Sequence, residues 1–450
     1  MEKFPDLNKY QNIHFIGIGG VSMSSLAMLL KGNGKNVTGS DSTESKNTKV
    51  LKEFGIPVFI GQKAENVGNA DLIVYTAAIS DNNPELVYAK ENNIPIIERA
   101  VLLGMLMLTY KHSVAVSGTH GKTTTTSMLS SIMLNGNYDP TILVGAHFKQ
   151  INSNHKIGNS DYSVYEACEY VNSFHHFYPE VAIILNIDSD HLDFFKDLDA
   201  IKESFLKFTK NIENGYIVIN GDDQNCEYII KNASSPVITY GLNNSNDCFA
   251  YNIRFESGLP VFDVNYKGEI LKDIKLSVFG EHNIYNALAT IAVSMLYSFD
   301  EAAIKNGLIN FKGADRRFEL KKTYNNAAIV DDYAHHPTEI KATICSAKSA
   351  DFTKTTVIFQ PHTYSRTKFL LDDFALELSK ADQVILTDIF SAREINTVGA
   401  NILDLRDKIP GSIYISSFED IANYIKSNAK PNELYILMGA GNINSIADMI

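Results

Sequence analysis

The stretch SVAVSGTHGKTT, residues 113–124, decides the fold prediction. Its apolar start predicts a β-strand, and the pattern that continues through Met128 and Leu129 predicts a helix directly after Gly-Lys-Thr. In such a turn, backbone N–H groups hold phosphate oxygens, Lys122 reaches the terminal phosphates and the Thr123 hydroxyl contacts Mg²⁺. The common phosphate loop has glycine at the position of Val116. Here the predicted phosphate contacts are Gly118, Thr119, His120, Gly121, Lys122, Thr123 and Thr124.

A second strand–loop–helix unit lies near the start of the chain, where IHFIGIGGVSM covers residues 13–23. A further strand, residues 36–41, ends in Asp41. The arrangement approximates the dinucleotide fingerprint, in which glycines let the backbone approach a pyrophosphate, but Ser22 replaces the third glycine. Taken alone, the loop is compatible with a turn that binds nothing, with a nicotinamide or flavin site, or with another nucleotide. Asp41 either contacts a ribose or caps the turn.

Strand-like and helical patterns alternate along the whole chain, which predicts an α/β fold with mostly parallel sheets flanked by helices. We expect three domains: a Rossmann-like domain in residues 1–108, a domain resembling P-loop ATPases in residues 109–314, and a second Rossmann-like domain in residues 315–450. Two nucleotide-type loops argue against a simple dehydrogenase. One loop should hold a nucleotide-linked substrate and the other ATP.

The composition is that of an ordinary globular protein, with 450 residues, 45% hydrophobic residues and a net charge of −12. This charge argues against nucleic-acid binding, which needs basic patches. We find no leader pattern and no apolar run of about 20 residues, so we expect a cytoplasmic protein that does not enter a membrane. The four cysteines form no CxxC pair and are expected to be reduced.

Motifs along the whole chain resemble, in order and spacing, those of the Mur ligases, a family of amide-bond-forming enzymes. Gly-Thr-His-Gly-Lys-Thr is similar to the variant phosphate loop of that family. The other matching segments are residues 14–20, 166–169, 186–193, 280–289, 311–319, 331–339 and 359–367.

The resemblance implies that ATP phosphorylates a carboxylate to an acyl phosphate, which an amine then attacks, with Mg²⁺ as the metal. The sequence contains no GxSxG elbow and no Cys–His nucleophile pair, which agrees with phosphoryl transfer that depends on positioning and charge. The implied catalytic residues are Lys122, Glu166, His191 and Arg317, and the implied metal ligands are Thr123, Glu166 and His191. The implied ATP contacts are the phosphate loop with His282, Asn283, Asn286, Arg316 and Arg317.

The remaining implied contacts bind the other two substrates. Those for a UDP-sugar are Gly17, Gly19, Gly20, Ser22, Met23, Ser40 and Asp41, and those for an amino acid are Tyr333, His335 and Arg366. From the residues alone, His191 would be a structural histidine, Arg316 and Arg317 a surface pair, and His336 a helix cap. The resemblance favours ligand roles for His191 and for one of the two arginines.

Leu206 stands about fifteen residues after His191, where several relatives carry a carbamylated lysine. This argues against the branches that depend on that lysine and is compatible with the branch that joins L-alanine to UDP-N-acetylmuramate in peptidoglycan synthesis. The nearest alternative is a sister ligase that adds a whole tripeptide during wall recycling, and the motifs at residues 333–337 and 360–366 favour single L-alanine over it. A folylpolyglutamate synthase would leave the first glycine loop unexplained. An inactive nucleotide-binding protein would not need Lys122 and Glu166, and an NAD-dependent oxidoreductase would need nicotinamide binding at residues 17–20.

Overall fold

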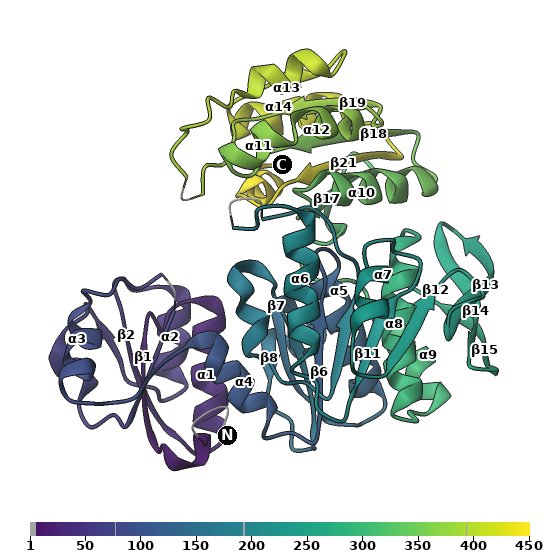
Figure 1. Cartoon of the computed structure of the whole chain (residues 1–450). Helices are drawn as coiled ribbons and strands as arrows, with labels where there is room; N and C mark the ends of the chain where they lie inside the picture. Colours follow the sequence, from purple (N-terminus) through teal and green to yellow (C-terminus); the bar gives the residue numbers. More distant parts are fainter. Residues whose placement is uncertain (1–5, 77, 192–193, 393) are drawn as a thin grey trace.

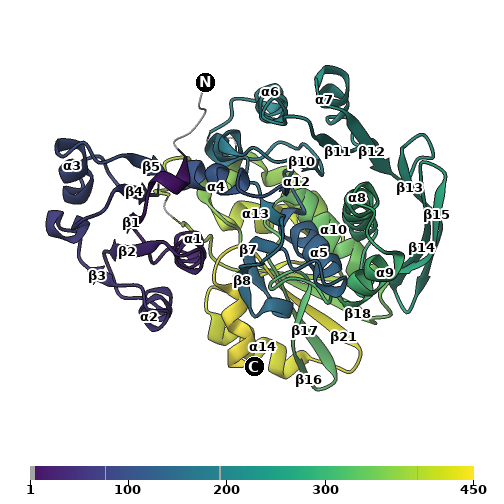
Figure 2. The same ribbon diagram turned by 90° about the horizontal axis from the view of Figure 1, so that it is seen from below.

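The computed structural model describes residues 6–76, 78–191, 194–392 and 394–450. Three sheets flanked by helices follow one another along the chain, which confirms the predicted three-domain α/β class. Figure 1 shows the N-terminal domain beside the central domain and the C-terminal domain over one end of the central domain. The view from below in Figure 2 agrees, with the N-terminal domain standing to one side. In the described part of the chain, no helix has the length and apolar character needed to cross a membrane.

The N-terminal sheet is parallel throughout, with strand order β3-β2-β1-β4-β5. Strand β1 is buried almost completely, as expected for a parallel strand that helices cover on both faces. The strands are β1 (Asn12–Ile16), β2 (Asn36–Asp41), β3 (Val58–Ile60), β4 (Leu72–Tyr75) and β5 (Ile96–Glu98). The helices are α1 (Val21–Gly32), α2 (Lys46–Glu53), α3 (Pro84–Glu91) and α4 (Arg99–Met107), with short turns η1 (Leu7–Lys9) and η2 (Ala64–Val67).

The central sheet has ten strands in the order β15-β14-β13-β12-β11-β10-β6-β9-β7-β8. Its middle is parallel, and antiparallel strands extend both edges. The strands are β6 (His112–Ser117), β7 (Thr141–Phe148), β8 (Ser153–Lys156), β9 (Tyr162–Glu166), β10 (Val181–Ile184), β11 (Tyr216–Asn220), β12 (Val237–Gly241), β13 (Cys248–Glu256), β14 (Leu259–Tyr266) and β15 (Glu269–Lys275). The helices are α5 (Lys122–Asn135), η3 (Lys149–Ile151), η4 (Tyr170–His176), α6 (Leu198–Thr209), α7 (Glu227–Asn232), α8 (His282–Leu296) and α9 (Glu301–Asn310).

The C-terminal sheet has the order β16-β17-β21-β18-β19-β20 and is parallel except for β16. Its strands are β16 (Glu319–Tyr324), β17 (Ala327–Asp332), β18 (Lys354–Phe359), β19 (Gln383–Leu386), β20 (Ile413–Tyr414) and β21 (Glu433–Met438). Its helices are α10 (Pro337–Ser349), α11 (Tyr364–Phe369), α12 (Leu371–Leu378), α13 (Ile402–Lys408), α14 (Phe418–Asn428), η5 (Ile443–Ser445) and α15 (Ile446–Met449).

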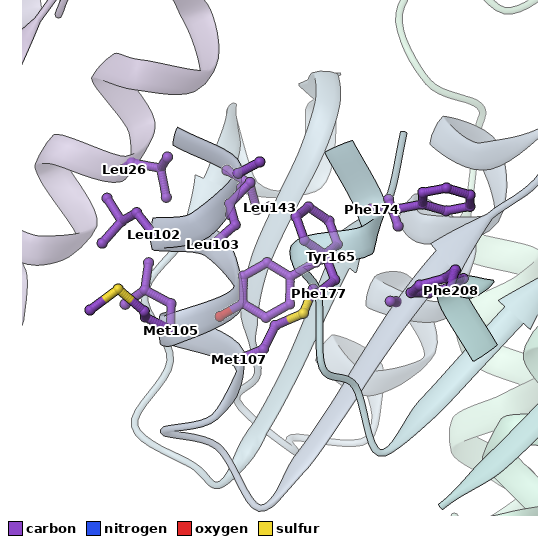
Figure 3. Packing of buried hydrophobic residues seen from close by; sticks show 14 of the residues in the cluster. Leu26, Leu102, Leu103, Met105, Met107, Leu143, Tyr165, Phe174, Phe177 and Phe208 are labelled. Atoms are coloured by element: carbon purple, nitrogen blue, oxygen red, sulfur yellow. The ribbon is translucent and has the colours of Figure 1, made fainter. Parts of the chain in front are cut away.

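Apolar packing joins the N-terminal domain to the central domain. One buried cluster contains Leu26 of α1, Leu103 of α4 and Tyr165 of β9, whose side chains lie together in Figure 3. Helix α4 approaches η4 so closely that a Cβ on Gly104 would lie 1.8 Å from the carbonyl oxygen of His176. The two domains therefore share one core, which makes them a single mechanical unit.

Polar side chains, by contrast, join the C-terminal domain to the central domain, and we call this contact the joint. The C-terminal domain has separate apolar clusters. At the joint, the His120 ring lies 3.2 Å from Asp188 and 3.5 Å from Glu339 of α10. The Thr338 hydroxyl donates a hydrogen bond to Asp188 at 2.7 Å. His336 caps α10, as its alternative interpretation predicted, and lies 3.1 Å from the carbonyl oxygen of Ser189.

A positive charge on His120 stabilises this joint. Burial alone would lower the pKa of His120, but its hydrogen bonds with Asp188 and Glu339 raise that pKa from 6.5 to about 9. The ring is therefore an imidazolium at neutral pH. A folded-state pKa above the unfolded value means that the stabilisation is complete below about pH 6.5 and is lost as the pH rises through about 9.

Replacing Gly104 by alanine should destabilise the shared core. The new methyl group would meet backbone rather than a movable side chain, and such overpacking typically costs about 1–3 kcal/mol, more than the ~1 kcal/mol gained in helix propensity. The control is Gly32→Ala, whose Cβ would meet only the flexible tip of Ile157. Urea unfolding should show a clear loss for Gly104→Ala and a smaller change for Gly32→Ala. Equal midpoints for both variants and the wild type would contradict the account of α4.

Raising the pH from 7 to 9.5 should lower the melting temperature of the wild type more than that of His120→Gln. The variant lacks the ring whose proton is lost in this interval, so its free energy of unfolding should fall less, by roughly 1–3 kcal/mol. Thermal scans across this pH range provide the measurement. Parallel pH dependence in the two proteins would show that His120 does not titrate at the joint.

Candidate active site

The phosphate loop connects β6 to α5, as the sequence predicted. Two glycines set its path: Gly118 has φ +137° and Gly121 has φ +86°, both in the region that favours glycine. A Cβ on Gly118 would lie 2.9 Å from Leu185 Cβ, and one on Gly121 would lie 2.8 Å from Asn286 Oδ1. No side chain caps the first turn of α5. Its N–H groups and the positive end of the helix are therefore suited to an anion.

Lys122 is folded back onto its own loop. Its ammonium group donates hydrogen bonds to the carbonyl oxygens of Gly118 at 2.6 Å and Thr119 at 2.9 Å. It also forms an ion pair with Glu169 at 2.9 Å. Burial would lower the pKa of Lys122, but the carboxylate of Glu169 raises it well above its usual value. The lysine is therefore charged, and an incoming phosphate would compete with Glu169 for it.

The predicted metal ligands fall into two neighbouring groups. The Thr123 hydroxyl donates to Glu166 at 3.1 Å, and the backbone N–H of Gly145 donates to the other oxygen of Glu166 at 2.8 Å. His191 instead lies 3.7 Å from Glu169, which links it to Lys122. The oxygen donors of Thr123 and Glu166 suit Mg²⁺, which prefers oxygen ligands. Residues 192 and 193 of the same motif lie outside the described residues.

A cavity of about 770 Å³ lies beside the phosphate loop, between the central and C-terminal domains. Its lining brings together three distant predicted segments. The predicted ATP contacts on its wall are His120, Gly121, Thr124, His282, Asn283, Asn286 and Arg317. The Asn286 side-chain amide donates to Asn283 at 3.0 Å, and its oxygen accepts from Thr125 at 3.2 Å. Burial and the nearby Arg317 lower the pKa of His282 to about 4, so its ring is neutral.

The structure separates the two adjacent arginines. Arg317 lines the cavity and lies 3.6 Å from Glu339. Arg316 has φ +61° and turns into the C-terminal domain, where it pairs with Asp331 at 3.2 Å and donates to the carbonyl oxygen of Gly439 at 2.7 Å. Arg317 is therefore the member of the pair that a ligand in the cavity would meet.

The N-terminal glycine loop is closed by Asp41, whose carboxylate accepts the N–H of Gly19 at 2.8 Å. This favours the turn-capping interpretation of Asp41. The Ser40 hydroxyl donates to the buried Glu85, and Ser40 and Met23 are 0% and 2% exposed, so these two predicted contacts do not lie at the surface of the loop. The turn itself is exposed at Gly20 and Val21. The remaining predicted contacts, Gly17, Gly19, Gly20 and Ser22, lie together at the start of α1.

The predicted amino-acid contacts gather at the joint. The rings of Tyr333 and His335 are 5.3 Å apart, and His335 lies 5.9 Å from His362. Arg366 of α11 lies 3.4 Å from His362 and pairs with Asp190 of the central domain at 2.8 Å. The central domain thus supplies an acid to a group that the sequence had assigned entirely to the C-terminal domain.

Sequence reasoning assigned no role to four residues that line or brace these groups. Glu169 holds Lys122, and Glu339 contacts both His120 and Arg317. Asp332 lines the cavity, and burial raises its pKa to about 6. Arg99, the first residue of α4, donates to the Ser22 hydroxyl at 2.9 Å. The positions of Glu169 and Asp332 at strand ends were the available signal, because ligand sites in α/β folds gather there.

Comparison with known proteins covers nearly the whole chain. The models described as Mur ligase family, catalytic domain; Mur ligase middle domain; and Mur ligase, glutamate ligase domain match residues 12–111, 116–294 and 316–441. The curated UDP-N-acetylmuramate–L-alanine ligase of Clostridium botulinum strain Okra is 49% identical over 448 residues, 98% of each chain. That of Clostridium tetani is 49% identical, over 99% of each chain.

Solved structures agree with these relatives. The UDP-N-acetylmuramate-alanine ligase MurC of Thermotoga maritima matches with a TM-score of 0.80 and 30% identity, covering 98% of this chain and 97% of that one. A murein peptide ligase of Psychrobacter arcticus matches with a TM-score of 0.68 and 26% identity, covering 97% of each chain. Three family models in order, full-length relatives and a shared three-domain architecture all lead to the same assignment: the chain belongs to the Mur ligase family.

Proposed function

We propose that the protein is an ATP-dependent ligase that joins L-alanine to the carboxylate of UDP-N-acetylmuramate, giving UDP-N-acetylmuramoyl-L-alanine, ADP and phosphate for peptidoglycan synthesis. The observation that carries the proposal is that the C-terminal domain contacts the central domain at two points of one joint. Glu339 lies 3.5 Å from His120 of the phosphate loop, and Arg366 pairs with Asp190 at 2.8 Å. Relatives 49% identical over almost the whole chain bear the name of this activity. The sister activity, addition of a tripeptide, is less favoured because two ligases of that kind with solved structures are 26% and 27% identical, against 49% for the curated relatives named for L-alanine.

The proposed reaction has two steps. The terminal phosphoryl group of ATP passes to the carboxylate of the UDP-sugar, which gives an acyl phosphate and ADP. The ammonium group of L-alanine then loses a proton to solvent, and the free amine attacks the acyl carbon. The C–N bond forms, the C–O bond to phosphate breaks, and the nitrogen gives up a second proton as phosphate leaves. Neither step needs a nucleophile from the enzyme, so catalysis depends on alignment and on the neutralisation of phosphate charge.

Different residues in and beside the cavity would bind the phosphates, the base and the metal ion of the first step. In this proposal the phosphate loop binds the ATP phosphates, Lys122 and Arg317 neutralise the transferred group, and His282, Asn283 and Asn286 hold the base. Mg²⁺ would be held by Thr123, Glu166 and His191, and when bound it supplies positive charge next to the phosphate oxygens. The ion pair between Lys122 and Glu169 would keep the lysine charged and in place before ATP arrives.

The other two substrates would approach from the two outer domains. We propose that the glycine loop of α1 binds the UDP-sugar, with Ser22 and Arg99 beside it, and that Tyr333, His335 and Arg366 bind L-alanine. We keep the domain boundaries at 108/109 and 314/315. The partners are then small molecules in the cytoplasm, without nucleic acid or membrane.

A panel of substrates provides the direct test of this function. Phosphate release should require ATP, UDP-N-acetylmuramate and L-alanine together, and the product should have the mass of UDP-N-acetylmuramoyl-L-alanine. UDP-N-acetylglucosamine, which lacks the carboxylate, is the matched negative substrate. Turnover with a tripeptide but not with L-alanine would instead support the sister activity, and hydride transfer with NAD would reject both.

Replacing Lys122 by glutamine should reduce turnover by a factor on the order of 10² or more, because a charged contact to the transferring phosphate is worth ~3 kcal/mol. The glutamine amide can still donate to Glu169, so the buried carboxylate keeps a partner. The control is Lys111→Gln, which removes an exposed lysine just before β6. Initial rates at saturating substrate provide the measurement. A loss of less than a few-fold in Lys122→Gln would contradict the assignment of residues 118–124 as the loop that binds the ATP phosphates.

A further inference from the structure

The ion pair between Arg366 and Asp190 is buried and crosses the joint. An Arg366 terminal nitrogen lies 2.8 Å from an Asp190 oxygen, and their side chains are only 13% and 9% exposed. The backbone N–H of His191 donates to the same Asp190 oxygen at 2.7 Å. Each group is therefore the other's close counter-ion.

Histidines and acids surround this pair. The His191 ring lies 3.9 Å from Asp190, and Glu339 lies 3.2 Å from His335. His335 and His362 flank Arg366. Burial lowers the pKa of His335 to about 4 and also lowers that of His362, so both rings are neutral near pH 7. The protein thus presents one cation and one anion, from opposite sides of the joint, in a partly enclosed place. A free α-amino acid carries the complementary pair, a carboxylate and an ammonium group one carbon apart.

We propose that Asp190 binds the α-ammonium group of the amino-acid substrate while Arg366 binds its carboxylate, so that the substrate inserts into the ion pair. This inference rests on the proposed function and extends it. Removing one member of a buried pair leaves an uncompensated charge, which is costly. In the free protein each member neutralises the other, and in the complex the zwitterion neutralises both.

The polarity of the pair also orients the substrate. Asp190 belongs to the central domain and immediately precedes His191, in the region where the acyl phosphate would form. Arg366 belongs to α11 of the C-terminal domain. An amino acid inserted with its ammonium end at Asp190 therefore has its amine toward the acyl carbon and its carboxylate away from it. The reverse orientation would place like charges together on both sides.

Asp190→Asn should raise the KM for L-alanine on the order of 30- to 150-fold, the value of a charge-assisted contact, while the KM values for ATP and the UDP-sugar change less than about three-fold. The matched control is Asp404→Asn, because Asp404 is an exposed acid whose partner, Lys368, lies on the same helix as Arg366. Asp190→Ser serves as a second variant if Asp190→Asn melts at a lower temperature.

Two competitive inhibitors test the roles of Asp190 and Arg366 separately. Ethylamine carries only the ammonium group and propionate only the carboxylate. In Asp190→Asn, ethylamine should bind more weakly and propionate more tightly, because Arg366 no longer has a competing internal carboxylate. Arg366→Lys should weaken propionate. If the pair only fastens the domains, Asp190→Asn will raise all three KM values together without this opposite change, and the inference is overturned. An inactive wild type would instead reject the proposed function.

Discussion

The contact between the phosphate loop and the C-terminal domain is the constraint on which the rest of the candidate site depends. Charged side chains make up much of it: His120 lies 3.5 Å from Glu339, and Arg366 pairs with Asp190 of the central domain at 2.8 Å. Such contacts can open into water at modest cost, because solvent replaces each lost partner. The apolar core shared by the N-terminal and central domains has no such alternative. The contact of the C-terminal domain is therefore the one of the two that can open at the lower cost.

This division gives each interface a function. The shared core sets the distance from the glycine loop of α1 to the phosphate loop, which in the proposed reaction a UDP-sugar would span to bring its carboxylate to the transferred phosphate. The joint would place the proposed amino-acid contacts and Arg317 near the same point. Closure of this kind would exclude water from an acyl phosphate that water would otherwise hydrolyse. Glu339 contacts His120 and Arg317 at once, so it couples the phosphate loop to the arginine that lines the cavity.

The sequence predicted the local features well, because glycine loops, strands and helix starts depend on residues that are neighbours in the sequence. The phosphate loop, the first glycine loop and the helix cap at His336 are examples. It could not predict contacts between distant segments. Lys122 and Glu169 are 47 residues apart, and Arg366 and Asp190 are 176 apart. Nor could it separate Arg316 from Arg317, because a positive φ at Arg316 turns the two side chains in different directions. The burial of the Ser40 side chain could not be predicted either, because its partner Glu85 lies on α3, far away in the sequence.

The central claim is that this joint assembles a site for acyl phosphate formation on the carboxylate of the UDP-sugar. The most direct measurement follows the oxygen atoms. With UDP-N-acetylmuramate labelled with ¹⁸O in its carboxylate, the phosphate released in the presence of ATP and L-alanine should carry one ¹⁸O atom, detected by mass spectrometry or by the isotope shift in ³¹P NMR. Released phosphate without the label would mean that the carboxylate is never phosphorylated, and would contradict the account.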